Sequence, residues 1–139
     1  MAQEIIKLDH IGIAVRSLDA ARKVFTDSLG IQVGGREEVP AQKVRLEFYQ
    51  IGETRIECLE PTSDDSPIAK FLERKGESIH HIALQVSDVA KALEQAKANG
   101  IEPIDSEPRV GAGGTKIAFL HPKSTHGLLI ELVEYLHEC

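Results

Sequence analysis

The sequence predicts an α+β fold in which two tandem β-α-β-β-β modules form a curved mixed sheet around a metal site. Two stretches lead to this prediction: LDHIGIAVRSLDAA, which begins at Leu8, and IHHIALQVSDVAKA, which begins at Ile79. Each places a histidine at the head of an alternating apolar run that continues into a helical pattern. Such internal similarity indicates that the second half of the chain repeats the first.

The first module is expected over about residues 6–61. After the strand HIGIAV, the segment RSLDAARKVFTDSLG has apolar residues at helical spacing, with Ser17 as its N-cap and Gly30 as its stop. A short segment follows, and then come two alternating runs, KVRLEFYQI and TRIECLE, joined across Gly52.

The second module, about residues 78–136, has the same order. The strand HIALQV leads into the helical segment SDVAKALEQAKANG, for which Ser87 or Asp88 is the N-cap. Two alternating runs, TKIAFLH and LLIELVE, close the module.

A helical connector, about residues 62–77, joins the modules. Ser66 is its expected cap, Pro67 lies in its first turn, and Gly76 follows its end. Because the chain is long enough for one ordinary domain, we expect a single domain over residues 1–139.

Composition excludes several classes of protein. The net charge of −6 comes without a lysine or arginine cluster, so nucleic-acid binding is not expected. No apolar run reaches the roughly 18 residues that a membrane span needs, and the start MAQEIIKLDH does not read as a signal peptide. We therefore expect a cytoplasmic protein that acts on a small molecule, with Cys58 and Cys139 as reduced thiols.

Four residues occupy matching positions in the two modules: His10, Glu57, His81 and Glu131. A single histidine at a strand end is usually a packed or surface side chain, but a glutamate inside an apolar run is costly to bury without a partner. If the modules pair about a pseudo-twofold axis, the four side chains can converge on one divalent ion. This ligand set suits Co²⁺, Mn²⁺, Zn²⁺ or Ni²⁺.

Strand alternation separates these four residues from their neighbours. His80, Glu60 and Glu134 lie an odd number of residues from the proposed ligands and should face the other way. Cys58 also faces away from Glu57 and is expected in the core.

The motifs DHIGIAV, IECLEP, HHIALQV, GTKIAFLHPKS and GLLIELVEY together resemble the vicinal oxygen chelate superfamily, which includes glyoxalases, bleomycin resistance proteins and dioxygenases. Within it, the chain most resembles the methylmalonyl-CoA epimerase family, over roughly residues 6–136. The resemblance implies that His10, Glu57, His81 and Glu131 bind one divalent metal ion per chain, with Co²⁺ expected first. It also implies an acyl-CoA substrate and a homodimer.

The implied reaction interconverts (2R)- and (2S)-methylmalonyl-CoA by proton transfer at C2 through a metal-stabilised enolate. Glu131 is the expected base. For a second base, the resemblance points to a position that holds Leu46 here, with Glu47 one residue away. A bulge can bring Glu47 inward, or Glu47 is a solvent-facing charge while another group serves, or the chemistry differs; we favour the solvent-facing charge.

Lys116 and Lys123 are further candidates, because either can meet the substrate carboxylate or the CoA phosphates. The stretch RVGAGGTK follows no phosphate-loop pattern and is equally compatible with a hairpin connection. His121 and His126 are expected to be turn residues.

Two other functions remain open from the sequence. Glyoxalase I uses the same fold and can use the same ligands, and a non-catalytic member of the superfamily can sequester a metal-chelating compound. Ring-cleaving dioxygenases fit less well, because they typically bind iron through two histidines and one carboxylate. A related substrate such as ethylmalonyl-CoA is also compatible, since one methylene discriminates by only about 1–3 kcal/mol.

Overall fold

The computed structural model of the chain describes residues 3–111 and 113–136, so Cys139 lies outside the described residues. These residues form two compact units, the 10–80 unit and the 81–136 unit, and the latter also includes residues 3–9. None of the described helices is long and apolar enough to span a bilayer. The strands are β1 (Ile5–Ala14), β2 (Val33–Val39), β3 (Val44–Ile51), β4 (Thr54–Pro61), β5 (Ser78–Val86), β6 (Arg109–Gly111), β7 (Thr115–Leu120) and β8 (Ile130–Tyr135). The helices are α1 (Leu18–Arg22), α2 (Pro67–Lys75) and α3 (Val89–Ala98).

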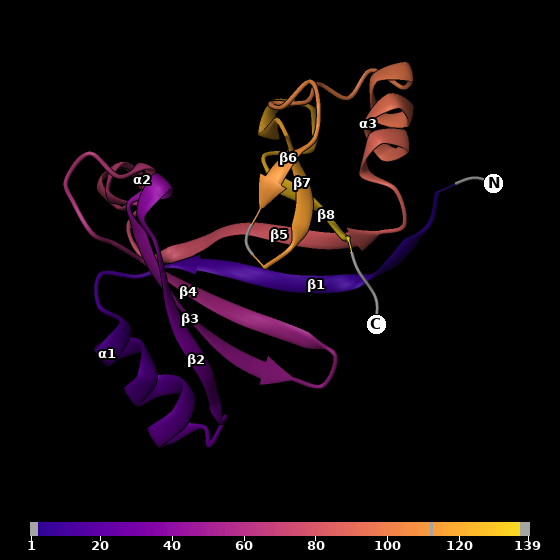
Figure 1. The fold of residues 1–139 in the computed structure, drawn as a ribbon. Helices are drawn as coiled ribbons and strands as arrows, with labels where there is room; N and C mark the ends of the chain where they lie inside the picture. The colour runs from indigo at the N-terminus through magenta and orange to yellow at the C-terminus, as the bar shows by residue number, and fades with distance from the viewer. Residues whose placement is uncertain (1–2, 112, 137–139) are drawn as a thin grey trace. The chain divides into compact units, whose positions relative to one another are not determined.

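The sheet of the 10–80 unit has the strand order β2-β3-β4-β1 (Figure 1). Its neighbours are antiparallel except for β1 and β4, which run parallel. In this parallel pair, His10 lies opposite Arg55 and Gly12 lies opposite Glu57. Because side chains alternate along a strand, these four residues share one face of the sheet.

Helix α1 begins where the sequence predicts. The Ser17 hydroxyl accepts a hydrogen bond of 3.1 Å from the Ala20 N–H, as an N-cap does. The regular helix ends earlier than expected, because Lys23–Ser28 continue it as a π-helical segment. Gly30 follows with φ +78°, in the left-handed region that favours glycine at the end of a helix.

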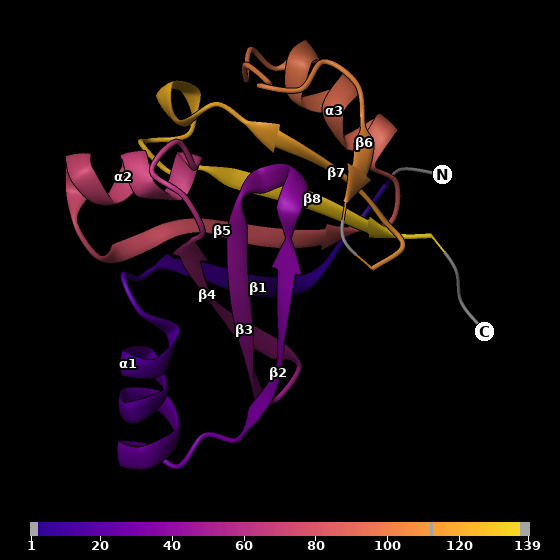
Figure 2. The same cartoon turned by 60° about the vertical axis from the view of Figure 1, so that its left-hand side comes forward.

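The face of this sheet that carries Tyr49 and Cys58 is covered by α1. Leu18 and Ala21 of the helix pack there, and Figures 1 and 2 show α1 beside the strands of its unit. Burial, together with the charge of Glu47, raises the pKa of the Cys58 thiol to about 12. Cys58 is therefore a core residue, as expected, and not a reactive thiol.

Helix α2 is the predicted connector. The Ser66 hydroxyl caps it by accepting a 3.1 Å hydrogen bond from the Ile68 N–H, Pro67 stands at its first position, and Gly76 ends it with φ +75°. It packs on the opposite face of the sheet from α1, which is the face of Glu57. Its core contacts are made by Ile68, Phe71 and Leu72 against Ala14, Val44, Leu46 and Leu59.

The 81–136 unit has the strand order β1-β5-β8-β7-β6, to which β1 contributes residues 5–9. The Ser87 N–H donates to the Glu4 carbonyl at 3.0 Å beyond the end of β5. Strands β5 and β8 run parallel, with Ala83 opposite Glu131, whereas the pairs β6–β7 and β7–β8 are antiparallel. Gly12 and Ala83 therefore hold equivalent places in the two modules, each opposite a glutamate.

Helix α3 repeats the role of α1 in this unit. Of the two candidate caps it uses Asp88, whose carboxylate accepts a 3.0 Å hydrogen bond from the Lys91 N–H. Ser87 instead accepts a hydrogen bond from the Glu4 N–H at 2.8 Å. Figures 1 and 2 show α3 beside β7, and its core side chains Val89, Ala92 and Leu93 pack with Val86, Ala118, Leu120 and Leu132.

Glu60 and Glu134 show how closely the modules repeat. Glu60 accepts a hydrogen bond from the Leu18 N–H at 2.7 Å, and Glu134 accepts one from the Val89 N–H at 2.9 Å. Each carboxylate thus satisfies the first free N–H of the helix in its own module. A glutamate three residues after Glu57 or Glu131 turns toward the helix, on the other side of the sheet.

We predict that Ser66→Ala destabilises the protein by about 1 kcal/mol, because it removes the side-chain acceptor at a buried helix start. Urea denaturation monitored by circular dichroism measures this change. Ser63→Ala is the matched control: it removes an exposed hydroxyl that contacts Asp65, and it should change the unfolding free energy by less than about 0.5 kcal/mol. Equal losses for the two variants would contradict the capping role.

Candidate active site

The first half of the candidate site is a histidine and a glutamate on β1 and β4. His10 is 6% exposed and Glu57 is 7% exposed. The His10 Nδ1 atom lies 3.4 Å from the Glu57 Oε2 atom, with both residues in the 10–80 unit. The strand register explains this contact, because His10 and Glu57 stand on the same face of neighbouring parallel strands.

Arg55 joins this pair, and it is a residue that the sequence analysis did not select. Its Nη2 donates a 2.9 Å hydrogen bond to Glu57 Oε2, and its guanidinium lies 5.2 Å from the ring centroid of Phe48. The signal was present in the sequence, because Arg55 stands two residues before Glu57 and therefore on its face.

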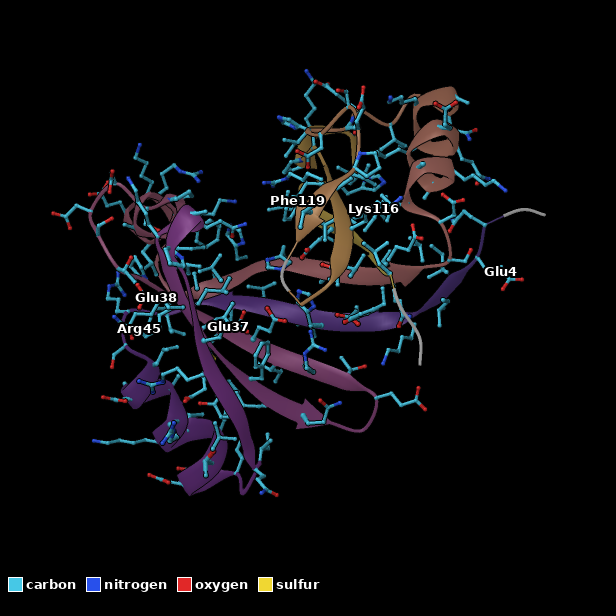
Figure 3. All side chains as sticks on the ribbon, in the orientation of Figure 1. Glu4, Glu37, Glu38, Arg45, Lys116 and Phe119 are labelled. Atoms are coloured by element: carbon cyan, nitrogen blue, oxygen red, sulfur yellow. The ribbon has the colours of Figure 1, made fainter. Side chains whose placement is uncertain are left out.

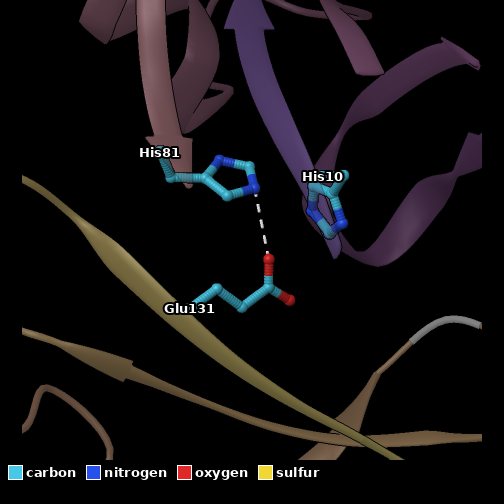
Figure 4. Close-up of side chains that lie close together, drawn as sticks. All are labelled: His10, His81 and Glu131. Carbon is cyan, nitrogen blue, oxygen red and sulfur yellow. Dashed lines mark ion pairs between the residues drawn. The ribbon is translucent and has the colours of Figure 1, made fainter. Parts of the chain in front are cut away.

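The second half is formed by His81 on β5 and Glu131 on β8. Figure 4 draws their ion pair, in which His81 Nε2 lies 3.2 Å from Glu131 Oε1. Both residues are buried. Phe119 stands opposite Glu131 on β7, where Figure 3 labels it, and its ring meets the His81 ring edge-on with centroids 6.0 Å apart.

Each module thus buries one imidazole and one carboxylate in contact with one another. Buried histidine and glutamate side chains are the donors that divalent transition ions bind. His10, His81 and Glu131 each offer one possible ligand atom. Glu57, the fourth predicted ligand, is not in this group; its carboxylate accepts a hydrogen bond from Arg55.

The neighbouring His80 has a packing contact. Its ring lies edge-on to Phe71 of α2, with centroids 4.9 Å apart and an interplanar angle of 78°. This contact joins the beginning of β5 to the connector helix within the 10–80 unit.

Glu47 is where the structure corrects the sequence analysis. The favoured expectation was a solvent-facing charge, but Glu47 is fully buried. The register of β3 against β4 is continuous and places Glu47 opposite Cys58, so no bulge in this pair turns the side chain toward Glu57. Alternation along β3 does turn Glu47 away from Glu57, but helix α1, and not water, lies on that side of the sheet.

Three hydrogen-bond donors hold the Glu47 carboxylate. Arg22 and Arg36 form ion pairs with it, the latter at 3.1 Å, and the Tyr49 hydroxyl donates to it at 2.9 Å. Burial opposes ionisation, but the hydrogen bonds from these three residues outweigh it and keep the pKa of Glu47 below its usual value. Burial and the neighbouring carboxylate raise the pKa of Tyr49, so its hydroxyl stays protonated and donating.

The candidate lysines lie on β7 and on the turn that follows it. Lys116 is half-buried on β7 and faces Glu134 across the strand pair (Figure 3). Lys123 is exposed and forms a 3.3 Å ion pair with Glu102. Neither observation shows a contact with Glu131 or His81.

The described part of the glycine-rich stretch belongs to strands β6 and β7 and the turn before β7, whereas His121 and His126 lie between β7 and β8. Residues 109–111 pair with β7 as an antiparallel hairpin, and a Cβ on Gly111 would come within 2.6 Å of the Thr115 hydroxyl. His121 accepts a 3.1 Å hydrogen bond from the Lys123 N–H at the start of a short 3-10 turn, and His126 has φ +61°. Both histidines are turn residues, as expected.

Comparison with known proteins identifies close relatives. The family model of the Glyoxalase/Bleomycin resistance protein/Dioxygenase superfamily matches residues 9–119. The ethylmalonyl-CoA/methylmalonyl-CoA epimerase of Cereibacter sphaeroides is 40% identical over 128 residues, which cover 91% of this chain and 96% of that protein. The mitochondrial methylmalonyl-CoA epimerase of Homo sapiens is 37% identical over 127 residues, covering 91% of this chain and 72% of the relative.

A solved structure gives the same result for the fold. It is a variant of the Streptomyces coelicolor methylmalonyl-CoA epimerase in complex with 2-nitronate-propionyl-CoA. The two folds match with a TM-score of 0.87 at 38% sequence identity, over 94% of this chain and 95% of that one. The predicted α+β fold of two β-α-β-β-β modules is thereby confirmed.

We predict that Glu47→Gln lowers the unfolding free energy by about 2 to 3 kcal/mol, because it leaves two arginines without their shared anion. Its Co²⁺ affinity should stay that of the wild type, since Glu47 faces away from Glu57. Urea denaturation and calorimetric titration measure the two quantities.

Glu38→Gln is the control for Glu47→Gln. Glu38 is exposed on β2 and faces Arg45 across the strand pair, where Figure 3 labels both. Removing an exposed charge of this kind should cost no more than about 0.5 kcal/mol. A Glu47→Gln protein as stable as Glu38→Gln would contradict the structural role of Glu47.

The stabilisation by Glu47 should also depend on pH. Its folded-state pKa lies below the unfolded value of about 4.5, so its contribution is complete above that value and is lost as the pH falls through the folded pKa. The difference in unfolding free energy between wild type and Glu47→Gln should therefore stay constant above about pH 5 and shrink toward pH 3. A difference that grew on acidification would reverse the assignment.

Proposed function

Because this chain belongs to the glyoxalase/bleomycin resistance protein/dioxygenase superfamily and, within it, to the methylmalonyl-CoA epimerase family, we propose that it interconverts (2R)- and (2S)-methylmalonyl-CoA. The observation that carries the proposal is the buried histidine–glutamate pair, made once in each module at equivalent strand positions. We propose ethylmalonyl-CoA as a second substrate, because the Cereibacter sphaeroides relative is named for both.

His10, Glu57, His81 and Glu131 would together hold one divalent ion, with Co²⁺ expected first and Mn²⁺, Zn²⁺ or Ni²⁺ as alternatives. The donor set supports this, since it combines two buried imidazoles with two buried carboxylates. When bound, such an ion supplies Lewis-acid stabilisation for the negative charge that develops on the substrate oxygens.

Glu131 is the residue that would take the proton from C2. Its carboxylate is buried beside His81 and lies across the strand pair from Phe119, and an ionised carboxylate can accept a proton as a general base. The position that the family resemblance assigns to a second base holds Leu46, whose side chain packs against α2. Glu47 is engaged on the other face, so we propose that water completes the exchange on the second side of C2.

The proposed partner, oligomeric state, location and domain count rest on the sequence and on the family. An acyl-CoA is the proposed small-molecule partner, with Lys116 and Lys123 as candidate contacts for its anionic groups. A homodimer and a cytoplasmic location stay predictions from the sequence, as does the treatment of the whole chain as one domain.

Glyoxalase I chemistry is the alternative within the superfamily, and sequestration of a metal chelate is the non-catalytic one. Identities of 37–40% to epimerases over more than nine-tenths of this chain favour epimerisation over both. Glyoxalase I is an enzyme, whereas the sequestering protein catalyses nothing, so the activity assay that follows also separates these two alternatives.

Incubation with methylmalonyl-CoA in D₂O should place deuterium at C2, as followed by NMR or mass spectrometry. Prior removal of metal with a chelator should abolish the exchange, and added Co²⁺ should restore it. Turnover of the methylglyoxal–glutathione adduct without any exchange would replace the proposal by glyoxalase chemistry. The absence of both activities would favour the non-catalytic protein that sequesters a metal chelate.

Glu131→Gln should lower the exchange rate by at least about 100-fold while weakening Co²⁺ binding much less, because an amide can still coordinate through oxygen but cannot accept the proton. Glu134→Gln, on the same strand but facing α3, is the matched control and should retain activity. Equal losses of Co²⁺ affinity and rate in Glu131→Gln would argue that the residue is only a ligand.

A further inference from the structure

Arg109 is the first residue of β6, and it faces the same side of the sheet as Glu131. It stands opposite Ile117 on β7, and Phe119, two residues farther along β7, stands opposite Glu131. Because side chains alternate along a strand and opposite residues share a face, Arg109, Phe119 and Glu131 lie on one face. All of them belong to the 81–136 unit. The second module therefore carries a permanent positive charge on the face of its candidate site.

The guanidinium of Arg109 lies over the Phe119 ring. Its central carbon is 5.5 Å from the ring centroid, and the same ring meets the His81 ring edge-on. One aromatic ring thus connects Arg109 to the imidazole of the candidate site. Stacking holds a guanidinium by its flat face, so the N–H groups in its plane can still donate hydrogen bonds.

Asp105 fixes Arg109 in this position. Its Oδ1 atom lies 3.2 Å from Arg109 Nε, and its Oδ2 atom accepts a 2.8 Å hydrogen bond from the Phe119 N–H. The carboxylate thus joins the arginine to the strand that carries the ring beneath it. Since the Asp105 side chain is only 17% exposed, this contact is shielded from most of the solvent. The long arginine side chain is therefore ordered before a ligand arrives, which lowers the entropic cost of binding.

The contact with Asp105 uses one of the five N–H donors of the guanidinium. Within the described part of the chain, Asp105 is the polar partner of the Arg109 side chain, and it contacts Nε. The Arg109 side chain is 49% exposed. Its Nη1 and Nη2 groups carry the other four N–H donors and form the fork that binds two oxygens of a carboxylate or a phosphate.

A local positive charge matters because the chain as a whole has a net charge of −6. An acyl-CoA carries phosphates, and methylmalonyl-CoA carries a carboxylate as well, so a ligand of this class needs a basic group near its binding site. Lys116 stands opposite Glu134, which turns to α3. Of Lys116 and Arg109, it is Arg109 that shares the face of Glu131.

We infer that Arg109 binds an anionic group of the acyl-CoA substrate, either the carboxylate of its acyl group or a phosphate of its CoA. The inference rests on the proposed function for the identity of the substrate. It uses contacts within the 81–136 unit alone. Asp105 is then a positioning residue, because it holds the guanidinium of Arg109 without contacting the ligand.

Calorimetric titration with two ligands tests the inference and identifies the anion. Propionyl-CoA has the phosphates without the carboxylate, and the methylmalonyl thioester of pantetheine has the carboxylate without a phosphate. Arg109→Gln should bind one of them on the order of tenfold more weakly than the wild type, because it loses charge-assisted hydrogen bonds. Weaker binding of propionyl-CoA assigns the phosphate, and weaker binding of the pantetheine thioester assigns the carboxylate. Unchanged affinity for both ligands overturns the inference.

Steady-state kinetics of the deuterium exchange separates ligand binding from support of the Phe119 ring. Arg109→Gln should raise KM for methylmalonyl-CoA about tenfold and leave kcat within about threefold of the wild type. Arg109→Lys keeps the charge but not the fork, so its KM should lie between the two. If Arg109 only held Phe119 beside His81, kcat would fall while both ligand affinities stayed the same, and the inference would be wrong.

Lys23→Gln controls for the loss of one positive charge. Lys23 is exposed and follows α1, which covers the face of its sheet opposite to that of Glu57. This variant should keep both ligand affinities, and thermal melts check that each variant is folded. Equal losses in Lys23→Gln and Arg109→Gln would reduce the effect to net charge and overturn the inference.

The wild-type protein distinguishes failure of this inference from failure of the proposed function. If it binds propionyl-CoA or the pantetheine thioester through Arg109 but exchanges no deuterium, the acyl-CoA contact stands and the epimerase is overturned. If it exchanges deuterium and Arg109→Gln matches it in KM and in both affinities, only the contact is overturned. A wild-type protein that binds neither ligand and exchanges no deuterium overturns both.

Discussion

The contact between a buried imidazole and a buried carboxylate is the interaction on which the proposed chemistry of this protein depends. Each module makes it from two parallel strands, β1 with β4 and β5 with β8. A carboxylate removed from water needs a partner or an ion, so these positions tolerate few other residues. The residues that lie opposite these two glutamates on the partner strands, Gly12 and Ala83, are both small.

The strict alternation of side chains along the strands sorts the charged residues between two environments. Glu57 and Glu131 face the histidines, whereas Glu60 and Glu134 turn to the helices and bind their first N–H groups. The same chemical group therefore serves as a candidate ligand on one face and as a helix partner on the other. Glu47 belongs to the helix face as well, where its arginine partners make it part of the core.

Sequence reasoning predicted most of the fold because the signals were local. The caps Ser17 and Ser66 and the stops Gly30 and Gly76 reflect backbone requirements that neighbouring residues satisfy. Local signals do not show which residues far apart in the chain correspond to one another. The internal repeat does, because it aligns the residues of the first module with those of the second. The π-helical segment Lys23–Ser28 had no such signal and was missed.

By itself the sequence determined the two modules, the faces of their strands and the four candidate ligands, since alternation and repetition are properties of the chain order. Only the tertiary structure decided what lies against each face. Glu47 became a buried ion-pair residue because α1 covers it and because Arg22 and Arg36 reach its carboxylate. Burial and charge pairing arise from residues far apart in the chain, which no local pattern encodes.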